Sequence, residues 1–225
     1  MKAYLTRSYG PEARLEEAQI PVPEPSSGQI LIEVKASSLN PVDNMFLRHD
    51  IGMNPELPAV LHGDVAGIVS AVGKSVNSFK SGDEVYACAG GFKGHGGALA
   101  EYMIADALLV AHKPRTLDFA SSAAFPLVSI TAWEGLMDRA NLRSGQHVLI
   151  HGGTGGVGHI ALQLAKIKGA RVATTISSED KAKIARDLGA DNIIFYRQQT
   201  VEQYVESLTH GKGFDIVFDT VGGKN

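Results

Sequence analysis

The sequence of 225 residues predicts two domains, a barrel-like β domain followed by a doubly wound parallel α/β sheet. Residues 1–113 contain several short segments of alternating apolar and polar residues separated by turn residues, which is typical of a compact β domain. From residue 114 onward, strand-like apolar runs alternate with segments of helical periodicity. A glycine-rich turn joins one of these strands to the helix that follows it. These observations predict a fold that is β in residues 1–113 and α/β in residues 114–225.

In the first domain, strands are predicted where apolar residues recur at every second position or form a short run. These segments are Met1–Thr6, Gln29–Ser37, Asp64–Val72, Glu84–Ala87 and Ala98–Ile104. The proline-rich stretch 21–28 excludes a helix between the first two strands. Strands and turns are therefore expected throughout this domain.

The second domain begins with helical spacing over Leu117–Asn141, which Pro126 is expected to break or kink. The strands predicted after it are Val148–Ile150, Arg171–Ile176, Asn192–Phe195 and Phe214–Phe218. One helix is predicted from the spacing of Ile160, Leu164 and Ile167 and stops at Gly169, and the others are Glu179–Leu188 and Val201–Thr209. A dinucleotide-binding (Rossmann) sheet has six strands in the order 3-2-1-4-5-6. Four strands are found, so the sequence predicts an incomplete Rossmann sheet and suggests a partial chain.

The turn after the first of these strands has the spacing of a dinucleotide-binding motif. It reads Gly153-Thr154-Gly155-Gly156-Val157-Gly158. In such a motif the first glycine permits the tight turn, the second lets the backbone approach a pyrophosphate, and the third lets the helix pack on the strand. The N–H groups at the start of the helix then bind the phosphates. The alternative is a glycine-rich turn without a ligand, which the strand before and the helix after it disfavour.

The composition excludes several other classes of protein. Net charge is −3, from 21 basic and 24 acidic residues, which gives no support to a nucleic-acid partner. Cys88 is the single cysteine, so neither an intrachain disulfide nor a cysteine-built zinc site is expected. The N-terminus lacks a signal-peptide core, and no apolar stretch approaches membrane-spanning length. We therefore expect a cytoplasmic protein that does not bind a membrane.

Four motifs in this order resemble the medium-chain dehydrogenase/reductase superfamily, and within it the metal-free quinone oxidoreductase branch that includes zeta-crystallin. They are Asn40-Pro41-Val42-Asp43, residues 58–67 (PAVLHGDVAG), residues 97–102 (GALAEY) and the glycine motif. The resemblance implies a GroES-like β-barrel domain in residues 1–113 and an NADP-binding Rossmann domain in residues 114–225. Members of the family are longer than this chain and are commonly homodimers, so the full-length form is expected to be a homodimer.

Many relatives in the superfamily are zinc alcohol dehydrogenases, and the resemblance locates their three catalytic zinc ligands in this sequence. The corresponding positions are Asn40, Gly63 and Leu127. Glycine and leucine side chains cannot bind a metal ion, and an asparagine amide is a poor zinc ligand. His62 lies next to Gly63, but a single histidine without a partner ligand is more simply explained as a hydrogen-bonded structural residue. No metal site is predicted.

The choice of cofactor depends on the end of the second Rossmann strand, where NAD-binding proteins usually carry Asp or Glu. Here Ser177 and Ser178 occupy that place and Lys181 follows within one turn, which favours a 2′-phosphate and therefore NADPH. In the resembling family a tyrosine after the third strand also reaches this phosphate, and Tyr196 has that position. Alternatively, Ser178 serves only as a helix N-cap, with Glu179 and Asp180 complementing the helix dipole.

The resemblance also implies candidate catalytic residues. Asn40 and Asp43 are expected beside the nicotinamide ribose, and Thr131 beside the carboxamide. Alternatively, Asn40 only shapes a turn before proline, and the Thr131 hydroxyl bonds its own helix. The expected activity is an NADPH-dependent, zinc-independent transfer of hydride to a quinone or an activated enone or enal. The alternatives are a non-catalytic NADPH-binding scaffold similar to a crystallin and, disfavoured by its missing ligands, a zinc alcohol dehydrogenase.

Overall fold

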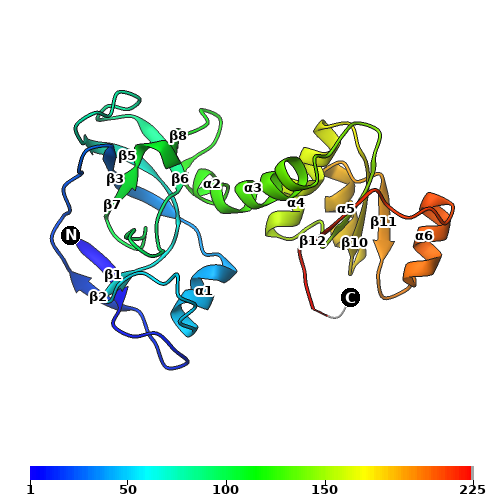
Figure 1. The fold of residues 1–225 in the computed structure, drawn as a ribbon, viewed down its shortest axis with the longest axis horizontal. Helices are drawn as coiled ribbons and strands as arrows, with labels where there is room; N and C mark the ends of the chain where they lie inside the picture. Colours follow the sequence, from blue (N-terminus) through cyan, green and yellow to red (C-terminus); the bar gives the residue numbers. More distant parts are fainter. Residues whose placement is uncertain (224–225) are drawn as a thin grey trace. The chain divides into compact units, whose positions relative to one another are not determined.

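The computed structural model describes residues 1–223, which form two compact units (Figure 1). The first runs from Met1 to Leu127, and the second begins at Val128. The first unit is built mainly from antiparallel strands, and the second contains a parallel sheet with helices. The expected fold class, a GroES-like β domain followed by a Rossmann-like sheet, is confirmed.

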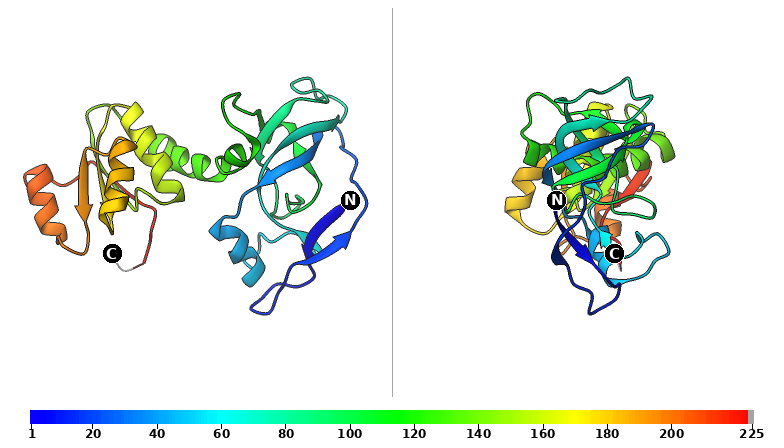
Figure 2. Two further views of the ribbon diagram at one scale, coloured as in Figure 1. Left: turned by 180° about the vertical axis from the view of Figure 1, so that it is seen from behind. Right: turned by 90° about the vertical axis from the view of Figure 1, so that its left-hand side faces the viewer.

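The strands of the first unit form two antiparallel sheets. Their bounds are β1 (Lys2–Thr6), β2 (Glu16–Gln19), β3 (Gln29–Ser37), β4 (Ala59–Val60), β5 (Asp64–Val72), β6 (Glu84–Cys88), β7 (Tyr102–Asp106) and β8 (Val110–His112). One sheet has the order β7-β3-β5-β6-β8, and the other has the order β2-β1-β4. The backbone N–H of Tyr4 donates to the carbonyl of Leu99 at 2.8 Å, which ties β1 to the segment before β7. Figure 2 shows this unit from behind.

The five-stranded sheet encloses the main core of this unit. Ile30 and Ile32 of β3 face that core together with Val65 and Val69 of β5, and all four are at most 1% exposed. Alternation along each strand produces this apolar face, as the sequence pattern predicts. The predicted strand Ala98–Ile104 begins too early, because residues 98–101 run beside β1 before β7 starts.

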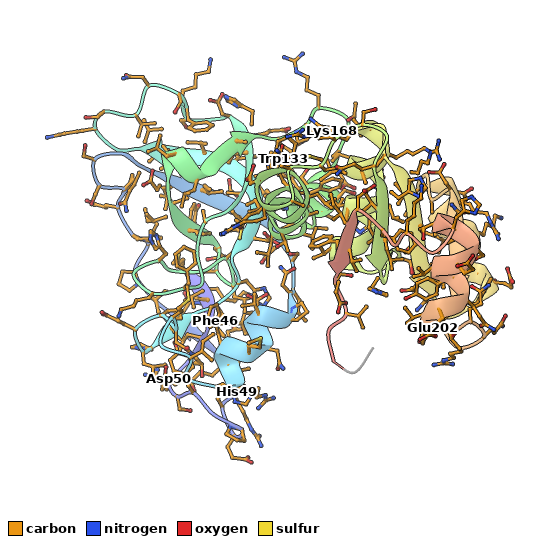
Figure 3. All side chains as sticks on the ribbon, turned by 45° about the vertical axis from the view of Figure 1, so that its right-hand side comes forward. Phe46, His49, Asp50, Trp133, Lys168 and Glu202 are labelled. Atoms are coloured by element: carbon orange, nitrogen blue, oxygen red, sulfur yellow. The ribbon has the colours of Figure 1, made fainter. Side chains whose placement is uncertain are left out.

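The expectation that strands and turns fill the first domain is wrong at α1 (Pro41–Arg48). Asn40 precedes this helix, Pro41 occupies its first turn, and Asp43 completes a capping box with Asn40. Proline at the first helical position followed by an acidic residue at the third is a recognisable start signal. Phe46 packs against Leu61, whereas His49, the C-cap residue that follows the helix, is exposed (Figure 3).

Two helices follow the β domain, and Pro126 separates them as expected. They are α2 (Phe119–Ala123) and α3 (Pro126–Trp133), and α3 continues into a π-helical segment, η2 (Glu134–Arg139). A short 3₁₀ turn, η1 (Ala107–Leu109), precedes β8. Asp118 caps α2 by accepting from the Ser121 N–H at 2.7 Å.

The second unit contains a four-stranded parallel sheet in the order β11-β10-β9-β12. The strands are β9 (His147–His151), β10 (Arg171–Ile176), β11 (Asn192–Phe195) and β12 (Ile216–Asp219), and the helices are α4 (Gly156–Ile167), α5 (Glu179–Asp187) and α6 (Val201–Thr209). When the four strands are numbered along the chain, their order across the sheet is 3-2-1-4. This is the first part of the Rossmann order 3-2-1-4-5-6.

Helices cover both faces of this sheet. Ile150 of β9 lies in a core cluster with residues of α4 and α5, whereas the neighbouring Leu149 faces Tyr204 of α6. Strands buried on both faces explain why the sequence here reads as continuous apolar runs and not as alternation. Among the described residues, no helix is both long and apolar enough to cross a membrane.

Candidate functional site

The glycine turn lies between β9 and α4 and is too tightly packed for side chains at two positions. A Cβ at Gly153 would lie 2.2 Å from Thr174 Oγ1, and a Cβ at Gly158 would lie 2.2 Å from the Gly152 carbonyl oxygen. The left-handed backbone conformation falls at Gly152, with φ of 71°. The expectation that Gly153 permits the tight turn is therefore wrong by one residue, and Gly153 instead allows the turn to approach β10.

Thr174 holds this turn against the sheet. Its hydroxyl donates to the Ile150 carbonyl at 2.7 Å and accepts from the Gly153 N–H at 3.0 Å. Thr174 is fully buried, so no water competes for these bonds. Sequence reasoning missed this residue, because nothing in a strand sequence indicates that a threonine will face a turn 21 positions earlier.

The start of α4 is open to a ligand. Gly155 is the N-cap, and within residues 1–223 no side chain caps this end. The first N–H groups of a helix have no partner inside it, and they carry the positive end of the helix dipole. Gly155 and Gly156 are exposed, and Thr154 and Val157 are partly exposed beside them. This arrangement suits a phosphate group.

The predicted selectivity residues Ser177 and Ser178 directly follow β10. Ser178 is the N-cap of α5, but its side chain makes no capping hydrogen bond in the described chain. If Ser178 served only as a helix N-cap, its hydroxyl would accept a hydrogen bond from the start of α5. Among the described residues it accepts none there, so the hydroxyl is available to a ligand. Lys181 is exposed on the first turn of α5, which also carries Glu179 and Asp180.

Tyr196 lies at the matching end of the neighbouring strand, because the parallel register pairs Ile176 of β10 with Phe195 of β11. The guanidinium carbon of Arg197 lies 5.7 Å from the centre of the Tyr196 ring, within the range of a cation–π contact. Sequence reasoning missed Arg197. The signal available was its position next to Tyr196, since the carboxyl ends of parallel strands converge on one edge of the sheet.

In the first unit, Asn40 and Asp43 are both buried at the start of α1. Asp43 Oδ2 accepts the Asn40 backbone N–H at 2.7 Å. Burial raises the pKa of the Asp43 carboxyl above its ordinary value, although this hydrogen bond acts in the opposite direction. The Asn40 amide donates to Asp64 Oδ2 at 2.8 Å, so Asn40 does more than shape a turn.

Asp64 is a fully buried carboxylate that connects separate segments of the first unit. Its Oδ2 accepts from Ser38 Oγ at 2.7 Å as well as from Asn40, and its Oδ1 accepts from the Leu127 backbone N–H at 2.9 Å. Burial and the proximity of Asp64 raise the pKa of the Cys88 thiol to about 12. Near neutral pH, Cys88 is therefore a protonated thiol close to Asp64.

His62 has a left-handed backbone conformation, with φ of 73°. Its Nδ1 lies 3.2 Å from Ser37 Oγ. Burial lowers the pKa of His62 below its ordinary value, against the opposing effect of Asp43 and Asp64. The ring is therefore held as a hydrogen-bonded, neutral imidazole, as the structural interpretation of this residue expects.

The three positions that the resemblance matches to zinc ligands of alcohol dehydrogenases have different roles here. A Cβ at Gly63 would lie 2.9 Å from the Gly90 carbonyl oxygen, so the backbone leaves no room for a side chain. Leu127 contributes its backbone N–H to Asp64, and Asn40 its amide. Among residues 1–223, no group of three or more His, Cys, Asp or Glu side chains is arranged to hold a metal ion.

The structure brings Asn40 and Asp43 together, and separately brings the glycine turn next to β10, whose other neighbour in the sheet is β11. Thr131 lies on α3 after Val128, in the second unit, and its side chain is exposed. Its expected contact with a carboxamide stays a prediction, as do the cofactor contacts of the glycine turn.

Comparison with known families matches residues 26–115 to the alcohol dehydrogenase GroES-like domain, and residues 156–225 to the zinc-binding dehydrogenase family. The NADPH-dependent alkenal/one oxidoreductase of Arabidopsis chloroplasts (Arabidopsis thaliana) is 39% identical, over 99% of this chain and 58% of the relative. The quinone oxidoreductase of Rattus norvegicus is 33% identical, over 96% of this chain and 64% of the relative. This chain thus spans less than two thirds of the length of either curated relative.

Among solved structures, an alcohol dehydrogenase superfamily protein from Novosphingobium aromaticivorans superimposes with a TM-score of 0.91. It is 41% identical, and the match covers 99% of this chain and 67% of that one. Sequence identity, both matched domains and the shared fold agree with the four motifs. The chain belongs to the medium-chain dehydrogenase/reductase superfamily, in its quinone oxidoreductase branch.

Proposed function

We propose that this chain carries the cofactor- and substrate-binding residues of an NADPH-dependent reductase that transfers hydride, without zinc, to a quinone or an activated enone or enal. The names of two relatives support this class of acceptor, since one acts on alkenals and enones and the other on quinones. Both kinds of acceptor form a resonance-stabilised anion when they receive hydride, so neither needs a Lewis acid. The protein has to orient the reactants, exclude water and supply a proton.

NADPH, when bound, supplies the hydride. We assign its pyrophosphate to the glycine motif, Gly153 to Gly158, and to the open start of α4. The 2′-phosphate is assigned to Ser177, Ser178, Lys181 and Tyr196, and we add Arg197. Hydroxyl groups and cations hold a phosphate, whereas a carboxylate in this place would repel it. That the Ser178 hydroxyl makes no capping bond within the described chain supports this assignment.

Asn40 and Asp43 are proposed to lie beside the nicotinamide ribose, and Thr131 beside the carboxamide. The burial of Asn40 and Asp43 in one hydrogen-bonded corner supports a role that needs fixed geometry. Residues 1–113 then serve as the substrate domain and residues 114–225 as the NADP-binding domain, with this boundary itself a prediction.

One observation carries the zinc-independent mechanism, namely the closed surroundings of Gly63. The position that holds a zinc-binding histidine in related alcohol dehydrogenases here approaches Gly90 so closely that even a Cβ would be 2.9 Å from its carbonyl oxygen. A histidine at this position would require the segment around Gly90 to move. Hydride transfer by this site therefore proceeds without metal activation of the acceptor.

The test is an NADPH-oxidation assay with quinones, enones and enals as acceptors, run with and without EDTA and repeated with NADH. The proposal expects turnover with NADPH that EDTA leaves unchanged, and slower turnover with NADH. Activity abolished by EDTA would instead indicate a zinc alcohol dehydrogenase. Saturable NADPH binding without oxidation by any acceptor would indicate the non-catalytic, crystallin-like alternative.

We further propose that the enzyme acts in the cytoplasm as a homodimer on small-molecule acceptors, without a nucleic-acid or membrane partner. The single cysteine supports the cytoplasmic setting, and the net charge of −3 supports the absence of a nucleic-acid partner. Sedimentation of the purified protein tests the dimer directly.

A further inference from the structure

We propose that Asp64 is a positioning residue that turns Asn40 into a hydrogen-bond acceptor toward its ligand, so that the ligand group bound there is a hydroxyl donor. This inference rests on the proposed function, which places Asn40 beside the cofactor, and it adds the chemistry of the contact. Asp64 itself reaches the ligand only through Asn40.

The hydrogen bonds among Ser38, Asn40 and Asp64 use both protons of the Asn40 side-chain amide. Asp64, as a carboxylate, only accepts hydrogen bonds, so the Asn40 side chain must turn its NH₂ group toward it. The Asn40 Nδ2 donates to Asp64 Oδ2 at 2.8 Å and to Ser38 Oγ at 3.1 Å. Ser38 in turn donates its hydroxyl proton to Asp64 Oδ2 at 2.7 Å. The three side chains form a closed ring in which both amide protons of Asn40 are used.

Only the Oδ1 atom of Asn40 is then available to a ligand. A carbonyl oxygen has two lone pairs, so it keeps an acceptor site even where the capping box at the start of α1 uses the other. Asn40 therefore cannot donate a hydrogen bond to the carbonyl group of a quinone or enone. It can accept one from a hydroxyl, either of the cofactor ribose or of the reduced acceptor.

Asp64 is fixed well enough to impose this orientation. It is fully buried, and in addition to Ser38 and Asn40 it is held by the Leu127 N–H, at 2.9 Å from Oδ1. A buried carboxylate with this many donors has no alternative position that keeps its hydrogen bonds. Ser38 and Asn40 belong to the loop that leads into α1, and Leu127 belongs to α3, so the hydrogen bonds of Asp64 also fix that loop.

The substitution Asp64→Asn is expected to reverse the orientation of the Asn40 side-chain amide, while the shape of the side chain at position 64 changes little. The amide that replaces the carboxylate keeps one oxygen for the Leu127 N–H and turns its own NH₂ toward Asn40. The Asn40 amide then has to rotate, and it presents NH₂ to the ligand in place of oxygen. Asp83→Asn is the matched control, because Asp83 also accepts a backbone N–H, from Lys80 at 2.9 Å, in a turn that is not part of this site.

Two measurements on the intact chain test the proposal. The first is hydrogen exchange of the Asn40 side-chain amide by NMR, with its signals identified by their loss in Asn40→Ala. Slow exchange is expected in the wild type and in Asp83→Asn, and fast exchange in Asp64→Asn. Exchange in the wild type as fast as that of the exposed Asn77 would overturn the proposed orientation.

The second measurement is steady-state kinetics with NADPH and a quinone. In Asp64→Asn, kcat is expected to fall on the order of tenfold to a hundredfold, because the bound reactant is misplaced. A raised KM for NADPH identifies the ribose as the hydroxyl source, whereas an unchanged KM for NADPH with weaker product inhibition by the hydroquinone identifies the reduced acceptor. Kinetics equal to those of Asp83→Asn would overturn the positioning role. A wild type that binds NADPH without turnover refutes the proposed function, and amide exchange then decides the orientation alone.

Discussion

The two hydrogen bonds of the Thr174 hydroxyl are expected to stabilise the glycine turn and to support its binding of NADPH. Replacing Thr174 by Val keeps the shape of the side chain but removes the hydroxyl that accepts from Gly153 N–H and donates to the Ile150 carbonyl. Both bonds lie in a fully buried position, so the Gly153 N–H would be left without a partner. An unsatisfied buried donor costs about 1–3 kcal/mol, and we expect a loss of about 2 kcal/mol in the free energy of unfolding.

The same change should weaken the binding of NADPH, because the turn that carries the phosphates loses its support from β10. A distortion worth about 1 kcal/mol raises Kd about fivefold. Calorimetric titration with NADPH and urea denaturation of the same preparations measure the two effects. Thr174→Ser is the rescuing variant, since it restores the hydroxyl.

Thr209→Val is the matched control for this experiment. Thr209 is also buried, donates to the Val205 carbonyl at 2.6 Å, and accepts from the Gly213 N–H at 2.9 Å. These bonds lie at the end of α6, in a different loop from the glycine turn. Both variants are expected to lose similar stability, and only Thr174→Val to lose affinity. An unchanged Kd in Thr174→Val, with the same loss of stability in both, would refute the role assigned to the turn.

Three further predictions follow from single residues. Gly158→Ala places a Cβ 2.2 Å from the Gly152 carbonyl oxygen, so it should lower the free energy of unfolding by about 1–3 kcal/mol and raise the Kd for NADPH. Gly96→Ala is the control, because its Cβ meets no atom within 4 Å. In urea denaturation it should change the free energy of unfolding by less than about 0.5 kcal/mol. The pKa of the Cys88 thiol is about 12, compared with 9.0 for an ordinary thiol. Near neutral pH, Cys88 should therefore react with iodoacetamide about a thousandfold more slowly in the folded than in the unfolded protein. Equal rates, measured by mass spectrometry, would contradict the burial of Cys88 beside Asp64. Lys181→Ala and Arg197→Ala should each raise the Kd for NADPH about tenfold without affecting NADH, as expected for lost charge-assisted bonds to a phosphate, and equal losses for both nucleotides would count against the assigned 2′-phosphate site.

The regular elements could be predicted from the sequence because local patterns determine them. Arg171–Ile176, Asn192–Phe195 and Val201–Thr209 match the structure at both ends, since buried strands and an amphipathic helix carry their periodicity within the segment. The helix α1 was missed although its start signal is local, because Asn40-Pro41 was interpreted as a turn. The short strand β4 has only two residues and exists through its pairing with β1.

The candidate site was predictable in part. The glycine motif and Ser177 follow from local sequence, and the structure locates them at the ends of β9 and β10. The hydrogen bonds of Asp64 were not predictable, because they join residues 24 and 63 positions apart. The left-handed conformation at Gly152 was also missed, because five glycines in seven residues give no local indication of which one makes the turn.

The site is proposed to prefer a dinucleotide with a 2′-phosphate. Calorimetric titration of the wild-type chain with NADPH and with NADH, in the presence of EDTA, tests it most directly, because binding requires neither a substrate nor turnover. We predict saturable binding of NADPH with a Kd at least about tenfold lower than that of NADH, since charge-assisted hydrogen bonds to the phosphate are absent with NADH. Equal affinities, or tighter binding of NADH, would contradict the claim.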